Sequence, residues 1–237
     1  AAFARDAAAV VRGITARGRL PLLVGGTGFY YRAVTRGLFE GPAAHPALRE
    51  RLEAIGARHG VEFLHRMVAR FDPPSAARIQ PRDRKRLVRA LEVRLLTGRP
   101  LTDHFAGTRP PLPEYEVTTI ALRLPSGLTA ERVARRVEAQ FAAGVVDEVR
   151  RQLAAGLPRS ALPFGGLVYR QILEMLDGVQ GEAETRELIV RENRHYARRQ
   201  LIWFRKEPNL DWLEGPGERS GAVAAADAIL RARGVIR

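Results

Sequence analysis

The sequence contains no cysteine, which excludes disulfide bonds and thiolate metal sites. No apolar run approaches the roughly 18 residues that a membrane-spanning helix needs. The five histidines show no spacing typical of metal ligands. These absences are typical of a cytoplasmic protein that associates with no membrane and has no metal site in its own residues.

Lysine is almost absent as well, since only Lys85 and Lys206 occur. The chain nevertheless has 39 basic against 26 acidic residues and a formal net charge of +13. This excess points to a polyanionic partner. The planar guanidinium of arginine binds phosphate through two N–H groups and stacks on bases, so the composition suits RNA.

A Walker A phosphate-binding loop is also missing, because G-x-x-x-x-G-K-[ST] occurs nowhere in the sequence. Residues 20–32 contain a different glycine segment, LPLLVGGTGFYYR. Residues 20–24 predict a buried strand, a tight glycine turn surrounds Thr27, and a helix follows. Backbone N–H groups at such a turn favour an anion, which assigns phosphate binding to Gly25 and Gly26. The alternative is a plain turn in which Thr27 caps the helix.

The pattern along the chain predicts an α/β fold with an inserted helical segment. Residues 1–40 form the first part of the α/β core, residues 41–110 an all-helical insertion, and residues 111–237 the C-terminal part of the core. Strands are predicted over residues 20–24, 117–124 and 210–213. Helices are predicted over residues 3–18, 28–37, 46–59, 61–70, 82–96, 129–143, 145–155, 168–177 and 182–206, with a short turn after Pro74 and a last helix at the end of the chain.

Two groups of cations fall on single helix faces. The first cationic stripe follows Pro81 at spacings i, i+3, i+4 and i+7, and consists of Arg82, Lys85, Arg86 and Arg89. The opposite face of the same helix is apolar and predicts burial of Leu87, Val88, Leu91 and Leu95. The second cationic stripe lies on the long predicted helix and consists of Arg191, Arg194, Arg198 and Arg205. The first stripe contains no interleaved acid, which favours contact with RNA; the alternative is a solvated surface. The second stripe is expected to face a groove or solvent.

Four segments, in order, resemble the family of bacterial tRNA dimethylallyltransferases. They are LPLLVGGTGFYYRAVTRGL at residues 20–38, RIQPRDRKRLVRALEV at 78–93, VYRQI at 168–172 with LDG at 176–178, and YARRQLIWFR at 196–205. The resemblance covers nearly the whole chain. It implies a P-loop NTPase-like parallel sheet with an inserted helical domain that binds tRNA.

The same resemblance implies an activity. A dimethylallyl group would pass from dimethylallyl diphosphate to the exocyclic amine of an adenosine beside the anticodon. The implied partners are a tRNA anticodon stem-loop and the diphosphate donor with Mg²⁺, and we expect a monomer. Base flipping is required, because the amine cannot reach a buried electrophile while the base is stacked.

The resemblance also assigns site residues. Arg170 is the predicted catalytic cation that stabilises the leaving diphosphate, and Thr27 is expected in the channel where the flipped adenosine meets the donor. The alternative for Arg170 is a salt bridge at a helix start, and the alternative for Arg49 is a surface role. The residues expected to bind tRNA are Thr27, Arg49, Arg82, Lys85, Arg86, Leu87, Val88, Arg89, Gly165, Gly166, Tyr169, Arg170, Arg194 and Arg198.

The sequence departs from the family in two respects. The Walker A loop and the aspartate proposed as general base have no counterpart in it, so we expect an incomplete enzyme, with no detectable transfer by residues 1–237 alone. Val168 stands where the family has a glycine before Tyr-Arg.

Two other functions compete with this one. One is a non-catalytic RNA-binding module. The other is a P-loop kinase or a prenyltransferase acting on free adenine nucleotides. The helical insertion argues against an enzyme that acts on free nucleotides, since such a substrate needs no domain that binds an anticodon.

Overall fold

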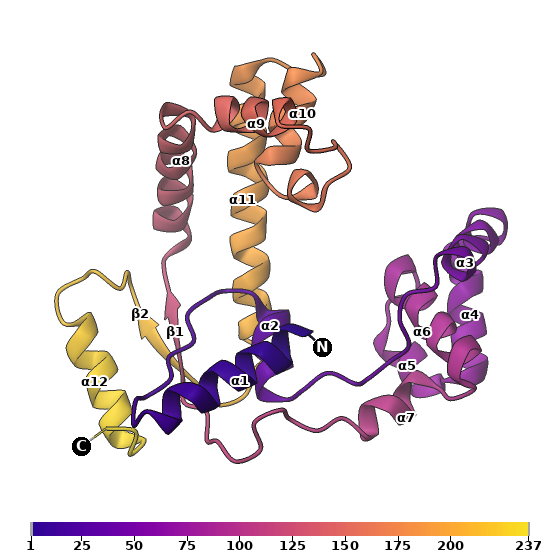
Figure 1. Ribbon diagram of the computed structural model, residues 1–237, viewed down its shortest axis with the longest axis horizontal. Helices are drawn as coiled ribbons and strands as arrows, with labels where there is room; N and C mark the ends of the chain where they lie inside the picture. Colours follow the sequence, from indigo (N-terminus) through magenta and orange to yellow (C-terminus); the bar gives the residue numbers. More distant parts are fainter. Residues whose placement is uncertain (1, 237) are drawn as a thin grey trace. The chain divides into compact units, whose positions relative to one another are not determined.

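The computed structural model describes residues 2–236 and divides into two compact units, Ala1–Glu116 and Val117–Arg237 (Figure 1). The architecture is mostly helical with a small parallel sheet, which agrees with the predicted α/β class at this level. Within the described range, no helix is both long enough and apolar enough to cross a membrane.

The first unit begins with α1 (Ala2–Ala16), which packs on α2 (Gly28–Thr35). The buried face of α1 is formed by small residues, including Ala8, together with Val11. Phe3, near the start of this helix, is 42% exposed. The small residues let the two helices approach closely, which leaves the larger side chains at the edge of the contact.

The predicted strand over residues 20–24 is not formed. Neither a strand nor a hydrogen-bonded turn is present over residues 20–27, and Leu22 and Val24 are 81% and 90% exposed. A strand exists only where a neighbour pairs with its backbone. Between residues 2 and 236 no strand pairs with this segment, so its apolar composition alone does not produce one.

The rest of the first unit is a helical bundle, as predicted for residues 46–107. Its helices are α3 (Pro46–His59), α4 (Val61–Phe71), α5 (Pro73–Arg78), α6 (Arg84–Thr97) and α7 (Leu101–Ala106). Leu64 and Leu91 are fully buried at the centre of its core. Gly56 on α3 is needed there, because a Cβ at this position would lie 2.9 Å from Leu64 Cδ1. Asp72 caps α5 through the Ser75 amide and also accepts a hydrogen bond from the Thr102 amide on α7.

The segment that leads from α2 into the bundle runs against the segment that leaves the bundle after α7. Gly37 has φ = +79°, and a Cβ there would lie 2.1 Å from the Arg109 carbonyl oxygen. Only glycine fits such a close approach with positive φ. The chain therefore enters and leaves the bundle at one place.

The second unit contains the sheet. Strand β1 (Thr119–Arg123) pairs in parallel with β2 (Leu210–Glu214), with Ala121 opposite Trp212. Parallel strands need a long crossover, and the intervening residues supply it as helices. These are α8 (Ser126–Ala142), α9 (Val145–Ala154), the short 3₁₀-helix η1 (Leu162–Gly165), α10 (Tyr169–Leu176) and α11 (Glu182–Phe204). The last helix, α12 (Ala222–Ala232), contacts β2.

The core of the second unit lies where α8 and α10 pack on α11 (Figure 1). Ile172 on α10 and Ile189 on α11 are both fully buried in it. This core fixes the N-terminal half of α11 and the start of α10, which carries the predicted catalytic Arg170.

Candidate functional site

The glycine segment at the start of α2 forms an open loop. Thr27 is the N-cap residue of α2, but its side chain makes no capping hydrogen bond; its carbonyl accepts from the Tyr31 amide at 3.0 Å. Thr27 and Gly25 are exposed. The side chain of Thr27 therefore does not cap α2.

The first cationic stripe differs from its prediction at its start. Helix α6 begins at Arg84 because Asp83 caps it, accepting a hydrogen bond from the Arg86 amide at 3.2 Å. Arg82 consequently lies before the helix instead of on its face. The stripe itself contains no acid, but carboxylates outside it pair with three of its four cations.

The three pairs differ in burial. Arg82 pairs with Glu62 of α4 at 2.8 Å and Arg86 with Asp83 at 2.6 Å, with the two arginine side chains 87% and 74% exposed. Exposed pairs of this kind contribute little to stability and exchange readily for another anion. Lys85 is exposed and has no carboxylate within 4.0 Å in the part of the chain described.

Arg49 and Arg89 meet at one buried carboxylate. Glu92 on α6 is fully buried and accepts from Arg49 Nε at 2.8 Å, from Arg49 Nη2 at 2.9 Å and from Arg89 Nη1 at 2.6 Å. The His45 amide donates to it as well, at 2.8 Å. Burial alone would raise the pKa of Glu92, but hydrogen bonds from Arg49, the His45 amide and Arg89 outweigh it and lower the pKa to about 2. We call these four residues the Glu92 cluster.

The apolar face of α6 is buried only in part. Leu87 and Val88 are 0% and 4% exposed and belong to the bundle core, whereas Leu95 is 56% exposed. The side chains of Leu87 and Val88 therefore offer no surface to RNA, and contact at these positions is left to their backbone. Leu95 lies in the last turn of α6, beyond the helices that cover the core.

The second cationic stripe is the less neutralised of the two. Arg191, Arg194, Arg198 and Arg205 are all exposed. Over residues 2–236 none of them has a carboxylate within 4.0 Å. Glu192 is the sole acid between residues 191 and 206, and its side chain turns to α10. This half of α11 therefore presents unbalanced positive charge.

Arg170 lies in a network of carboxylates. Its Nη2 donates to Glu192 Oε2 at 2.7 Å and its Nη1 to Glu174 Oε1 at 3.3 Å, and the side chain is 42% exposed. Gln171 is fully buried and donates from Nε2 to the same Glu192 oxygen at 2.7 Å. The salt bridge considered for Arg170 is thus present, and the guanidinium still has an exposed side.

Gln171 also holds the turn before α10, because its Oε1 accepts from the Val168 amide at 2.7 Å. Val168 has φ = +76°, a conformation that favours glycine and that β-branched residues rarely adopt. The backbone therefore has a conformation suited to glycine although the residue is valine. Strain at such a position costs on the order of 1–3 kcal/mol.

The other residues predicted beside Arg170 lie around this turn. Gly165 ends η1, and the Gly166 carbonyl accepts from the Arg170 amide at 3.1 Å. The Tyr169 hydroxyl donates to Glu148 of α9, which raises the pKa of Tyr169 together with partial burial. Gly165, Gly166 and Tyr169 therefore shape the start of α10 around Arg170.

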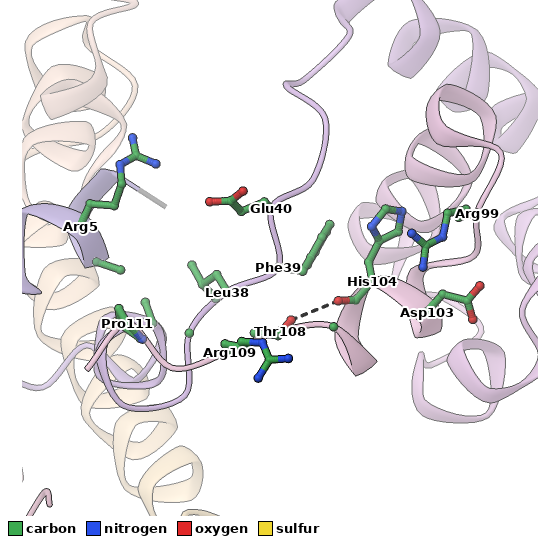
Figure 2. A pocket seen from close by; sticks show the side chains of 14 residues that line it. Arg5, Leu38, Phe39, Glu40, Arg99, Asp103, His104, Thr108, Arg109 and Pro111 are labelled. Carbon is green, nitrogen blue, oxygen red and sulfur yellow. Dashed lines mark hydrogen bonds between the residues drawn. The ribbon is translucent and has the colours of Figure 1, made fainter. Parts of the chain in front are cut away.

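A cavity of about 460 Å³ lies elsewhere, at the base of the bundle in the first unit (Figure 2). Arg5 of α1, Glu40 and His104 of α7 are among the residues that line it. None of the residues predicted from the sequence lines this cavity. Several of the predicted cations, namely Lys85, Arg86, Arg194 and Arg198, lie instead on exposed helix faces.

The sequence reasoning missed Glu92, Gln171 and Glu192. Each lies within or next to a segment that was singled out, and each is an acceptor close in sequence to a predicted arginine. Glu92 follows Arg89 by three residues and Gln171 follows Arg170 directly. For Glu92 the available signal was a carboxylate at helical spacing from a predicted cation, whereas the contact between Arg170 and Glu192 joins residues 22 apart and had no such signal.

Comparisons with known proteins identify the family of the chain. A family model described as IPP transferase matches residues 1–207. The tRNA dimethylallyltransferase of Koribacter versatilis is 38% identical over 97% of this chain and 74% of its own length, and that of Solibacter usitatus is 44% identical over 91% and 70%. The crystal structure of the full-length tRNA isopentenylpyrophosphate transferase from Bacillus halodurans is 31% identical with a TM-score of 0.64, covering 98% of this chain and 72% of that one. This chain belongs to the IPP transferase family.

Proposed function

We propose that residues 1–237 form the part of a tRNA dimethylallyltransferase that binds tRNA and stabilises the leaving diphosphate. The reaction moves a dimethylallyl group from its diphosphate to the exocyclic amine of an adenosine beside the anticodon. The observation that carries the proposal is the identity of 38% and 44% to two proteins of that name, each over more than nine-tenths of this chain. The chain spans 74% and 70% of those proteins.

We further propose that residues 41–110 are a helical insertion in a P-loop NTPase-like core made of residues 1–40 and 111–237. The close approach of Gly37 to the Arg109 carbonyl supports this, because an inserted domain leaves and re-enters its host at one place. The parallel pairing of β1 with β2 supports a core of parallel strands.

The RNA contacts of the proposal are the two cationic stripes and Arg49. Lys85 and the second cationic stripe have no carboxylate partner in the region described, and the exposed pairs of Arg82 and Arg86 can exchange for phosphate. Binding of RNA to such a surface releases counterions, so its affinity should depend steeply on salt.

Arg170 is proposed to stabilise the diphosphate as the C–O bond breaks, and Thr27 to line the path of the adenosine. Gly25 and Gly26 would offer backbone N–H groups to a phosphate. Glu192 and Glu174 hold Arg170 before the donor binds, and its exposed side leaves N–H groups for the leaving group.

Mg²⁺ is a usual companion of a diphosphate, but the described residues offer it no built site. No group of three or more histidine, aspartate or glutamate side chains that could hold a metal occurs among the described residues. We therefore derive no step through Mg²⁺ from these residues.

Salt-dependent binding of an anticodon stem-loop tests the RNA contacts. We expect Lys85→Ala and Arg86→Ala each to weaken binding and to reduce the slope of log affinity against log salt by roughly 0.7 to 1 for each lost phosphate contact. Titrations at several salt concentrations measure the slope. Arg231→Ala is the matched control, because Arg231 pairs with Asp227 on α12 and lies outside both stripes. Slopes equal to wild type in both test variants would contradict the proposed surface.

A further inference from the structure

The Glu92 cluster joins residues that are far apart in sequence. Arg49 on α3 lies 43 residues before Glu92, and the His45 amide 47 residues before it. A fully buried carboxylate is costly unless it is paired and hydrogen-bonded. Glu92 meets that condition with four hydrogen bonds, so it fixes the start of α3 and the middle of α6 in one geometry.

The cluster carries a net positive charge, since two guanidiniums share one carboxylate. Each guanidinium has five N–H donors. Two donors of Arg49 are bound to Glu92, while one donor of Arg89 is bound to Glu92 and a second to the Pro42 carbonyl at 2.9 Å. The Arg49 and Arg89 side chains are 41% and 30% exposed. Each arginine thus keeps donors for a further anion on its exposed side.

The two guanidiniums are also held in place. The Arg89 guanidinium carbon lies 5.8 Å from the centroid of the Phe39 ring, which adds a cation–π contact to its two hydrogen bonds. Free arginine side chains lose rotamer entropy when they bind a ligand, and this loss weakens binding. Side chains that are already ordered bind a phosphate without that loss.

We propose that Glu92 is a positioning residue for RNA binding, which holds Arg49 and Arg89 side by side as a paired site for backbone phosphate. The inference rests on the proposed function, because it takes an RNA phosphate as the ligand. The negative charge of Glu92 by itself repels RNA. If Glu92 positions the two arginines, its removal should nevertheless weaken RNA binding.

Glu92→Gln tests the sign of this effect. The variant removes a negative charge, so charge alone would tighten binding of a synthetic anticodon stem-loop. Loss of positioning should instead weaken it, by about five- to 100-fold at constant salt. Glu62→Gln is the matched control, because it makes the same charge change at an exposed carboxylate paired with Arg82. Glu62→Gln should bind as tightly as wild type or more so.

A second variant separates positioning from charge and from folding. Glu92→Asp keeps the charge but is one methylene shorter, so it cannot reach both guanidiniums, and it too should weaken binding. Circular dichroism melts establish that each variant is folded. In an Arg49→Ala background, Glu92→Gln should have a smaller effect than in wild type, because the two residues act together.

The outcomes separate the two proposals. If wild type shows no salt-dependent binding, the proposed function fails and this inference fails with it. If Lys85→Ala and Arg49→Ala weaken binding but folded Glu92→Gln and Glu92→Asp bind like wild type, the positioning role alone is overturned. Weaker binding by both Glu92 variants, with Glu62→Gln unaffected, supports it.

Discussion

Replacement of Arg170 by alanine is expected to lower kcat for dimethylallyl transfer by a factor on the order of 100 or more. Negative charge builds on the diphosphate as the C–O bond breaks, and a cation aimed at it acts mainly in the transition state. The affinity for tRNA should change little. Single-turnover kinetics and equilibrium binding measure the two effects, in a form of the protein that also carries a Walker A loop.

The control for this prediction is Arg159→Ala, which removes an equally charged side chain from the same unit. Arg159 pairs with Asp177 and is not part of the proposed site, so its loss should leave kcat unchanged. In Arg170→Ala the Gln171 amide still donates to Glu192, which should keep α10 folded, and a thermal melt checks this. If Arg170→Ala weakened tRNA binding with kcat intact, Arg170 would belong to the RNA surface.

The helices could be predicted well because their signals are local. The bounds of α3 agree with the expected residues 46–59, where Pro46 can begin a helix and Gly60 has the positive φ that follows its end. The strands β1 and β2 were expected over nearly the same residues. The residues of a helical segment decide its structure, whereas the two strands also need each other as pairing partners.

Features that depend on distant residues could not be predicted. Residues 20–24 have the composition of a strand, but no pairing partner is present in the chain from residue 2 to residue 236. The acids that neutralise the first cationic stripe include Glu62, which is 20 residues from Arg82. Sequence spacing finds the cations on one helix face, whereas only the packing of α4 beside α6 brings Glu62 to Arg82.

Acid should destabilise the fold through Glu92 in a definite pH range. The pKa of this carboxyl is lowered from 4.5 to about 2 in the folded chain. A lowered pKa contributes stability that is fully present above the unfolded pKa and is lost as the pH falls through the folded pKa. The contribution is on the order of 3 kcal/mol, and it should disappear between pH 4.5 and about pH 2.

Urea denaturation of wild type and Glu92→Gln at a series of pH values isolates this contribution. Other carboxyls with lowered pKa values, among them Asp72 and Glu62, titrate in both proteins and cancel in the difference. The free energy of unfolding of wild type should exceed that of the variant most above pH 4.5, and the two should converge toward pH 2. Glutamine does not titrate, so a contribution from the charge of Glu92 must make the difference in free energy of unfolding vary with pH. If that difference did not vary with pH, Glu92 would act through shape and packing alone.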